Sequence, residues 1–264
     1  MTLLFIYWEI WMTEQKKIKI WIIWWSGLDN PDILKNAKDI EVTTEYGQPS
    51  SPLKVGMIEW VEVVILARHG REHTIPPTQV NYRANIMALK NAGCTHIIAT
   101  TAVGSLREEI QRGDLVFPDQ FIDFTRRRDV SFYETFAPHS PLHTPMADPF
   151  SDELRKIFIA SAQDLNIVHH TKWTVVTIEW ARFSTRAESA MFRMRWADII
   201  NMSIAPEAIL ANEAGIPYAA IAMSTDYDCW KTDEEPVTRD AILEIFKQNV
   251  DKVIKVILYS ISKI

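Results

Sequence analysis

Polar and ionisable side chains stand directly after several apolar runs of the sequence. Arg68 and His69 follow one such run, and Asp226 and Asp228 follow another. An arginine can bind an oxyanion bidentately, and two neighbouring carboxyls tend to raise the pKa of one of them, which can then donate a proton. These residue types suit a reaction that binds an anion and protonates a leaving group, although an Asp-x-Asp segment alone is more often a loop turn.

Seven apolar, β-branched runs predict strands, and several have the continuous hydrophobicity of a sheet covered on both faces. Helical patterns lie between them, so we expect the fold class to be α/β: a single-domain α/β/α sandwich with a large mixed central sheet. Functional residues of such a sheet lie on loops at strand ends, where we expect Arg68, Thr101, Ser203 and Asp226. The predicted strands are Ile18–Ile23, Val61–Leu66, His96–Thr100, Leu115–Phe117, Thr174–Ile178, Ile199–Asn201 and Tyr218–Met223.

Capping residues mark the predicted helices. A helix over Asn81–Asn91 ends before Gly93, which suits a left-handed C-terminal position. Ser151 is an N-cap followed by acidic residues, and Pro206 opens a helix that Gly215 closes. The last helix has one apolar face, which we expect to be core or subunit contact, formed by Ile242, Ile245, Phe246, Val250, Val253, Ile254 and Ile257.

Composition limits the function classes. The chain has 264 residues, 47% of them hydrophobic, and a formal charge of -6 without a sustained basic block, so we expect no nucleic-acid partner. The run Arg126–Arg128 is expected to be a solvated loop or a local salt-bridge partner. Cys94 and Cys229 are the only cysteines and lack metal-ligand spacing. We therefore expect no disulfide framework, no zinc site and a cytoplasmic location.

Residues 1–11 are apolar, but they lack the basic leading region of a signal peptide, and no stretch of about 18 apolar residues follows. We expect them to be neither a signal peptide nor a membrane span, and we expect no membrane partner. They are interpreted as a leader that contributes nothing to the fold, with the functional domain over residues 12–264.

Ordered motifs along nearly the whole chain, from about Ile18 onward, resemble those of one known family. They are Leu66–His73, Asn81–Asn85, Thr100–Leu106, Asp119–Asp123, Glu179–Ser189, Asn201–Ser203, Pro206–Glu207 and Thr225–Asp228. Together they resemble the trimeric purine nucleoside phosphorylase family. The resemblance implies that family's fold and the phosphorolysis of S-methyl-5'-thioadenosine to adenine and 5-methylthioribose 1-phosphate, in purine and methionine salvage. It also implies a homotrimer, phosphate as co-substrate, and neither a metal nor an organic cofactor.

The resemblance further implies roles for individual residues. In this family an aspartate in the segment Thr225–Asp228 goes with 6-aminopurines: Asp226 would protonate purine N7, and Asp228 would accept from the 6-amino group. Phosphate would be bound by Ser26, Arg68, His69, Thr101, the backbone of Ala102 and Ser203. The purine would stack on Phe183, the ribose would lie above Met202, and two histidines would lie near its 5' end. The nucleoside-binding residues are thus Phe183, Ser184, Met202, His73 and His143.

Two other functions stay open: a broader purine nucleoside or methylthioinosine phosphorylase, and a nucleoside-binding relative with impaired catalysis. The latter depends on tryptophans where the family carries glycine, which lets backbone N–H groups approach a phosphate closely. Either these codons are UGA and are read as glycine in the natural chain, or the tryptophans are genuine. Genuine indoles at Trp24, Trp25 and Trp180 would crowd the phosphate and base loops. The positions are Trp21, Trp24, Trp25, Trp60, Trp173, Trp180 and Trp196.

Overall fold

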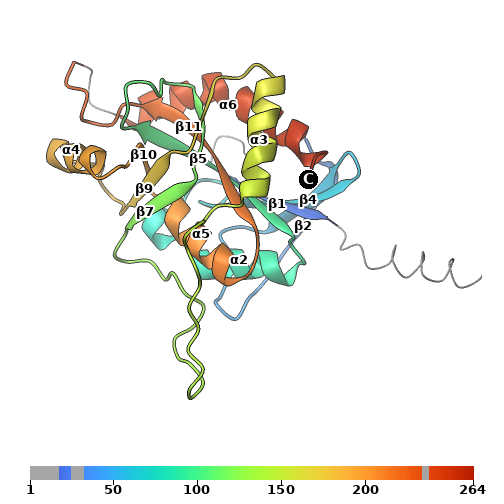
Figure 1. Ribbon diagram of the computed structural model, residues 1–264. Coiled ribbons are helices and arrows are strands. Elements are labelled where there is room, and N and C mark those ends of the chain that lie inside the picture. The colour runs from blue at the N-terminus through green and yellow to red at the C-terminus, as the bar shows by residue number, and fades with distance from the viewer. Residues whose placement is uncertain (1–17, 25–32, 234–237) are drawn as a thin grey trace, which may run out of the picture.

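The computed structural model describes residues 18–24, 33–233 and 238–264, whose strands form one central sheet (Figure 1). The strands are β1 (Lys19–Trp24), β2 (Lys35–Ile40), β3 (Leu53–Ile58), β4 (Val61–Ala67), β5 (His96–Ser105), β6 (Leu115–Phe117), β7 (Gln120–Phe124), β8 (His169–Thr171), β9 (Thr174–Ile178), β10 (Ile199–Asn201) and β11 (Tyr218–Asp226). β1 pairs in parallel with β4 and β5, and β11 pairs in parallel with β5. β10 pairs antiparallel with the end of β5, so the sheet is mixed, as predicted.

Neighbouring residues of the central strands point to opposite faces of the sheet, as the period of two requires. In β1, Ile20 and Ile22 pack in one apolar core, whereas Trp21 and Ile23 pack in another. All four side chains are fully buried. Both faces of the sheet are therefore covered, which explains why its central strands are continuous apolar runs.

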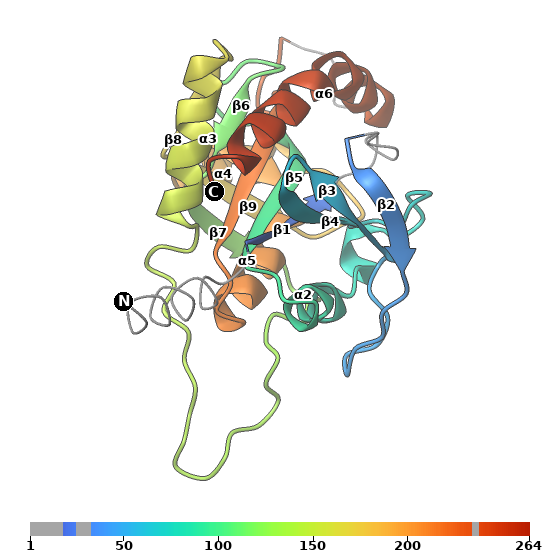
Figure 2. The same ribbon diagram turned by 90° about the vertical axis from the view of Figure 1, so that its right-hand side faces the viewer.

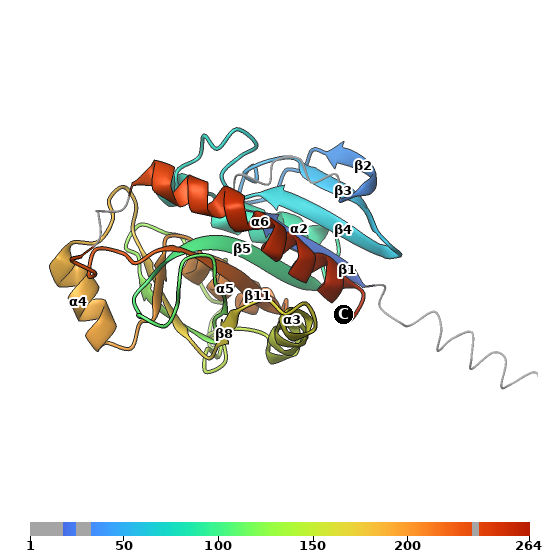
Figure 3. The same cartoon turned by 90° about the horizontal axis from the view of Figure 1, so that it is seen from above.

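Helices cover the two faces and complete three layers (Figures 2 and 3). α3 (Asp152–Asp164) and α6 (Arg239–Ile261) pack on the face of Ile20, while α2 (Tyr82–Asn91) and α5 (Ile204–Glu213) pack on the opposite face. α4 (Arg186–Met194) covers a smaller core beside β9 and β10. The predicted α/β/α sandwich with a large mixed sheet is confirmed.

Most helix boundaries agree with the predicted capping residues. Asn81 and Ser151 cap α2 and α3 through their side-chain oxygens. α5 begins at Ile204, ahead of the predicted start at Pro206, because a proline in the first turn removes no helical hydrogen bond. α4 has no predicted counterpart, although Thr185 opens it with a capping box.

All predicted strands are confirmed, but β5 and β11 are longer than expected. β5 continues to Ser105 because it stays paired with β11 and then with β10. Thr101 and Ala102 therefore lie within a strand, not on the loop that we expected after it. β2, β3, β7 and β8 were not predicted; β2 is polar and exposed along its whole length, so its composition is that of a loop.

Some expectations concern parts of the chain that the structure does not describe. The predicted leader, residues 1–11, lies there, as do Trp25 and Ser26. Among the described residues, no helix has the length and apolar character that a membrane span needs. The segment between β7 and α3, residues 125–151, includes a long excursion away from the three layers (Figures 1 and 2).

Candidate active site

A cavity of about 880 Å³ opens beside the ends of β4, β10 and β11 and along the second half of β5. Most of the predicted site residues line it: His69, His73, Thr101, Ala102, Phe183, Ser184, Met202, Ser203, Asp226 and Asp228. Arg68 and His143 do not line it, and Ser26 lies outside the described residues. The sheet thus gathers at one cavity residues that are far apart in the sequence.

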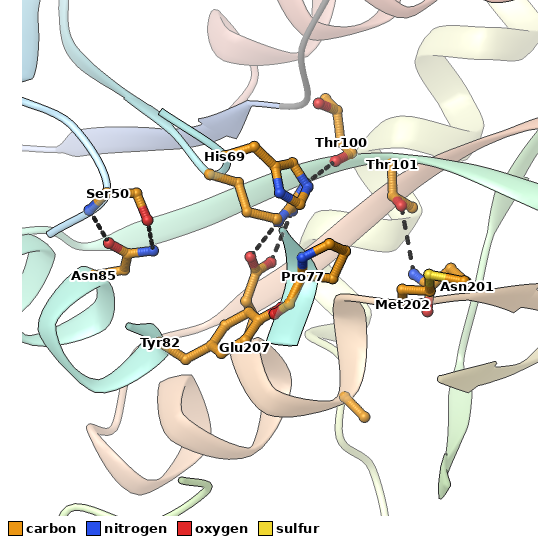
Figure 4. Close-up of polar contacts among 12 residues, drawn as sticks. Ser50, His69, Pro77, Tyr82, Asn85, Thr100, Thr101, Asn201, Met202 and Glu207 are labelled. Carbon is orange, nitrogen blue, oxygen red and sulfur yellow. Dashed lines mark hydrogen bonds and ion pairs between the residues drawn. The ribbon is translucent and has the colours of Figure 1, made fainter. Parts of the chain in front are cut away.

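Arg68 lies behind the cavity wall and is fully buried. Its Nε donates to Glu207 Oε1 at 2.5 Å and its Nη2 to Oε2 at 2.9 Å, which forms a bidentate ion pair (Figure 4). Nη1 donates to the Thr100 carbonyl oxygen at 2.8 Å, and the Tyr218 hydroxyl donates to Glu207 Oε2 at 2.9 Å. Burial opposes the charge of Arg68, but the Glu207 carboxylate raises its pKa above the ordinary value. Arg68 is therefore held charged and in one orientation.

His69 faces the cavity with little solvent exposure. Its Nδ1 lies 2.8 Å from the Ile75 carbonyl oxygen, and its ring lies against that of His73, with 4.8 Å between the centroids. Burial, and then the positive charge of Arg68, lower the pKa of His69 to about 3. The imidazole is therefore neutral at neutral pH.

Hydroxyl groups and a helix N-terminus also face the cavity. Ser203 is the N-cap of α5, and its side chain makes no capping hydrogen bond. The N-terminus of α5 carries partial positive charge, which favours an anion, although the Ala205 backbone N–H donates to the Thr177 hydroxyl at 3.1 Å and Pro206 has no N–H. Thr101 donates to the Ala102 carbonyl oxygen at 3.0 Å and accepts from Asn201 Nδ2 at 3.4 Å (Figure 4). With His69, these groups can bind an oxyanion.

Two carboxyls, the half-buried Asp226 and the buried Asp228, supply the acid chemistry of the cavity. Asp226 accepts from the Thr225 hydroxyl at 2.7 Å and from the Asp228 backbone N–H at 2.9 Å. Burial raises the pKa of Asp226 to about 6 and raises that of Asp228 as well. Asp228 Oδ2 and the Ser184 hydroxyl are buried and make no well-aligned hydrogen bond among the described residues, although the Ser184 and Ser189 hydroxyls lie close enough to the Asp228 carboxyl to oppose the rise of its pKa. Unpaired polar atoms on a cavity wall indicate that a polar ligand completes them.

Arg128 joins the segments that surround Met202, a role that residue spacing did not indicate. Its Nε donates to Glu179 Oε1 at 2.7 Å and its Nη1 to the Met202 carbonyl oxygen at 3.1 Å. The Thr78 hydroxyl donates to Glu179 Oε1 at 2.5 Å. Burial opposes the charge of Glu179, but these hydrogen bonds lower its pKa to about 2. Of the run Arg126–Arg128, therefore, Arg128 is a salt-bridge partner, and its side chain is buried.

His143 lies far from its expected neighbours in the sequence and is not brought into the cavity of its own chain. It is exposed on the segment between β7 and α3, where its ring contacts that of Phe136 with 6.2 Å between the centroids. Tyr133 and Leu142 on the same segment are also about half exposed. This segment therefore presents aromatic and apolar side chains away from the core.

The described tryptophans leave the cavity open. Trp24, the last residue of β1, packs in the core and does not line the cavity, while the loop that it was expected to crowd lies outside the described residues. Trp180 does line the cavity and is 44% exposed. Trp21 and Trp24 are buried, and neither indole N–H has a partner among the described residues. Trp196 lies just after α4 in the left-handed region, at a φ of 65°.

Comparison with known proteins gives one consistent result. The sequence profile of the Phosphorylase superfamily matches residues 19–262. The chain is 52% identical over 255 residues to S-methyl-5'-thioadenosine phosphorylase of Danio rerio. The aligned region covers 96% of this chain and 91% of the relative. It is 48% identical over 246 residues to the enzyme of that name from Pyrococcus horikoshii, covering 93% of each.

Solved structures agree with the sequence relatives. Methylthioadenosine phosphorylase from Schistosoma mansoni, in complex with adenine, superposes with a TM-score of 0.88 and is 43% identical, covering 93% of this chain and 91% of that one. A mutant of the adenosine/methylthioadenosine phosphorylase from the same organism, in complex with methylthioadenosine, gives a TM-score of 0.87 at 42% identity, covering 93% and 91%. Among the described residues, no group of His, Cys, Asp and Glu is arranged to hold a metal ion.

Proposed function

Since the chain belongs to the phosphorylase superfamily, we propose that it catalyses the phosphorolysis of S-methyl-5'-thioadenosine to adenine and 5-methylthioribose 1-phosphate. The observation that carries this proposal is that one cavity is lined by two kinds of group. Carboxyls of raised pKa, Asp226 and Asp228, line it together with His69 and with Ser203, the N-cap of α5. Such a cavity can hold an oxyanion and can also protonate a purine.

In the reaction, a phosphate oxygen forms a bond to C1' of the ribose as the bond from C1' to purine N9 breaks. The electron pair of the broken bond goes to adenine, and protonated Asp226 gives its proton to N7, so that adenine leaves neutral. Asp226 suits this task because burial raises its pKa to about 6, so that part of it is protonated near neutral pH. The positive charge at the helix end stabilises the transferred phosphate.

We propose that adenine is preferred because of Asp228 and Ser184. The Asp228 carboxyl presents Oδ2 to the 6-amino group as an acceptor, and the Ser184 hydroxyl supplies a second contact. A 6-oxopurine would place an oxygen there instead, and two acceptors would face each other. A buried polar group left unpaired in this way discriminates strongly between substrates.

We further propose that the chain is a homotrimer that acts in the cytoplasm without a metal or an organic cofactor. The segment bearing His143 supports the assembly, since it exposes Tyr133, Phe136 and Leu142 and does not reach the cavity of its own chain. In an oligomer it would reach the nucleoside of a neighbouring copy. The two cysteines are free, which fits a reducing compartment.

The test is to incubate the purified chain with S-methyl-5'-thioadenosine and to measure adenine and 5-methylthioribose 1-phosphate, with and without phosphate. We expect both products only with phosphate, and slower turnover of inosine-type substrates. Adenine release without phosphate would indicate hydrolysis, and nucleoside binding without any product would favour the impaired relative. Light scattering coupled to size exclusion checks the trimer.

A further inference from the structure

We propose that His69 makes the anion site selective for a protonated oxyanion, because its Nε2 accepts a hydrogen bond from the P–OH group of hydrogen phosphate. The site would then reject tetrahedral dianions that carry no proton, such as sulfate. The inference rests on the proposed function, since it takes the anion beside His69 to be phosphate. It assigns His69 an accepting role, whereas the Ser203 hydroxyl can donate to the anion.

The tautomer of His69 follows from its contacts with Ile75. Nδ1 lies 2.8 Å from the Ile75 carbonyl oxygen, and a carbonyl oxygen can only accept, so Nδ1 carries a proton. The Ile75 backbone N–H donates to the His69 carbonyl oxygen at 3.0 Å, which ties the two residues together a second time. The ring orientation is therefore fixed by the chain that bounds the cavity.

The surroundings of the ring oppose a second proton. His69 is only 3% exposed, its neighbour Arg68 is permanently charged and fully buried, and the positive charge of Arg128 also acts on the ring. His73, the remaining titratable contact, adds no negative charge. The Glu207 carboxylate is engaged by Arg68 in a bidentate pair. A neutral imidazole with its proton on Nδ1 has a bare lone pair on Nε2.

That lone pair has no partner among the described residues, and His69 lines the cavity together with Ser203 and Thr101. The Ser203 side chain makes no capping hydrogen bond, so its hydroxyl can donate to an unprotonated phosphate oxygen. Nε2 fits only an oxygen that bears hydrogen, as one oxygen of hydrogen phosphate does. Sulfate and monofluorophosphate have the same shape and charge, but each would face Nε2 with a lone pair.

The test measures dissociation constants of phosphate, sulfate and monofluorophosphate for the full chain by isothermal titration calorimetry without nucleoside. We expect phosphate to bind about 10- to 100-fold more tightly than either proton-free dianion, the range for one hydrogen bond to a charged group. His69→Phe keeps a ring of similar shape and should reduce this ratio to below about threefold. Ser203→Ala is the matched control, since it removes a group that treats all three anions alike and should leave the ratio unchanged.

Equal affinities of the unsubstituted protein for the three anions would overturn the inference while phosphorolysis persisted, so the proposed function would survive. If phosphate itself did not bind, the proposed function and this inference would fail together. ¹⁵N NMR of the histidine side chains tests the tautomer without any substitution. We expect His69 to be neutral with its proton on Nδ1 at pH 7, and a proton on Nε2 would overturn the assignment.

Discussion

Replacing Asp226 by asparagine removes the ionisable proton but keeps a side chain of the same size at this position. Asn has the same shape, and its amide oxygen can still accept from the Asp228 backbone N–H, which lies 2.9 Å from Asp226 Oδ2. The amide nitrogen would then face the Thr225 hydroxyl, which can turn toward the Val103 carbonyl oxygen, 3.2 Å away. The variant keeps a hydrogen-bond donor for purine N7 but cannot give up a proton.

The raised pKa of Asp226 sets the expected size of the effect. With a pKa of about 6, roughly a tenth of the molecules carry the proton at pH 7. General-acid catalysis contributes about 10²- to 10⁴-fold, so kcat should fall by about that factor in Asp226→Asn. For the unsubstituted enzyme, kcat should also fall about tenfold for each pH unit above 6, and this decline should be absent from the variant. The KM for phosphate should stay within about twofold, since the carboxyl does not hold the anion.

Asp226→Asn should also change stability in a defined direction. Because the folded chain raises the pKa of Asp226 from 3.8 to about 6, it binds the proton more tightly than the unfolded chain does. The stability that this proton contributes is full below pH 3.8 and is lost as the pH rises through 6. Asparagine does not ionise, so it avoids the cost of holding a charged carboxylate at this position at pH 7. The free energy of unfolding at pH 7 should therefore rise by about 1–3 kcal/mol.

The assay is adenine release over pH 5–9 at saturating S-methyl-5'-thioadenosine and phosphate, combined with urea unfolding of both proteins. Asp164→Asn is the matched control, because Asp164 is an exposed residue on α3 that pairs with Lys263. It should leave kcat and its pH profile unchanged. A variant Asp226→Asn that keeps its kcat, or that keeps the decline above pH 6, would refute the role of Asp226 as the acid.

Three further substitutions test the surroundings of the site. Glu207→Gln leaves the charge of Arg68 buried with a weaker partner, so the free energy of unfolding in urea should fall by about 3 kcal/mol; a loss below about 1 kcal/mol would contradict the structural role of the pair. A Cβ at Gly104 would lie 2.9 Å from Ile200 Cγ2 and 3.0 Å from Asp226 Oδ2. Gly104→Ala should therefore displace the carboxyl and lower kcat about 10- to 100-fold with the fold intact, as circular dichroism would show, and an unchanged kcat would argue against that crowding. Trp196→Gly relieves a left-handed backbone at an indole that is 82% exposed, so thermal unfolding should show a gain of about 1 kcal/mol, whereas a loss would mean that the indole packs in solution.

The central strands were predictable because burial on both sheet faces imposes a continuous apolar pattern. Val61–Ala67 and Thr174–Ile178 are examples, and both were located from the sequence to within one residue. The edge strand Lys35–Ile40 was not, because a strand with one paired neighbour and no buried side chain needs no apolar residues. Helix ends were predictable wherever a capping side chain was present, as at Asn81 and Ser151.

The residue types of the site could be predicted from the sequence, but the hydrogen-bond and ion-pair partners of these residues could not. Position after an apolar run located Arg68 near a strand end, yet only the fold shows that the bidentate partner of Arg68 is Glu207, on α5. Likewise, only the fold shows that Arg128 donates to the Met202 carbonyl oxygen, because the two residues lie far apart in the sequence. The sequence analysis assigned His143 to the nucleoside-binding residues. That role stays a prediction, because it requires His143 to reach the nucleoside of a neighbouring chain.

The tryptophans bear on stability at three of the six described positions and on the cavity at one. Trp21 and Trp24 each bury an indole N–H without a partner among the described residues, and such a group costs about 1–3 kcal/mol. Trp196 adds backbone strain, because its left-handed φ is one that glycine adopts freely. All three costs would vanish with glycine, which is the residue expected if these codons are UGA. Among the described tryptophans only Trp180 lines the cavity, and the space beside it remains open, so genuine tryptophans at the described positions would not close the cavity.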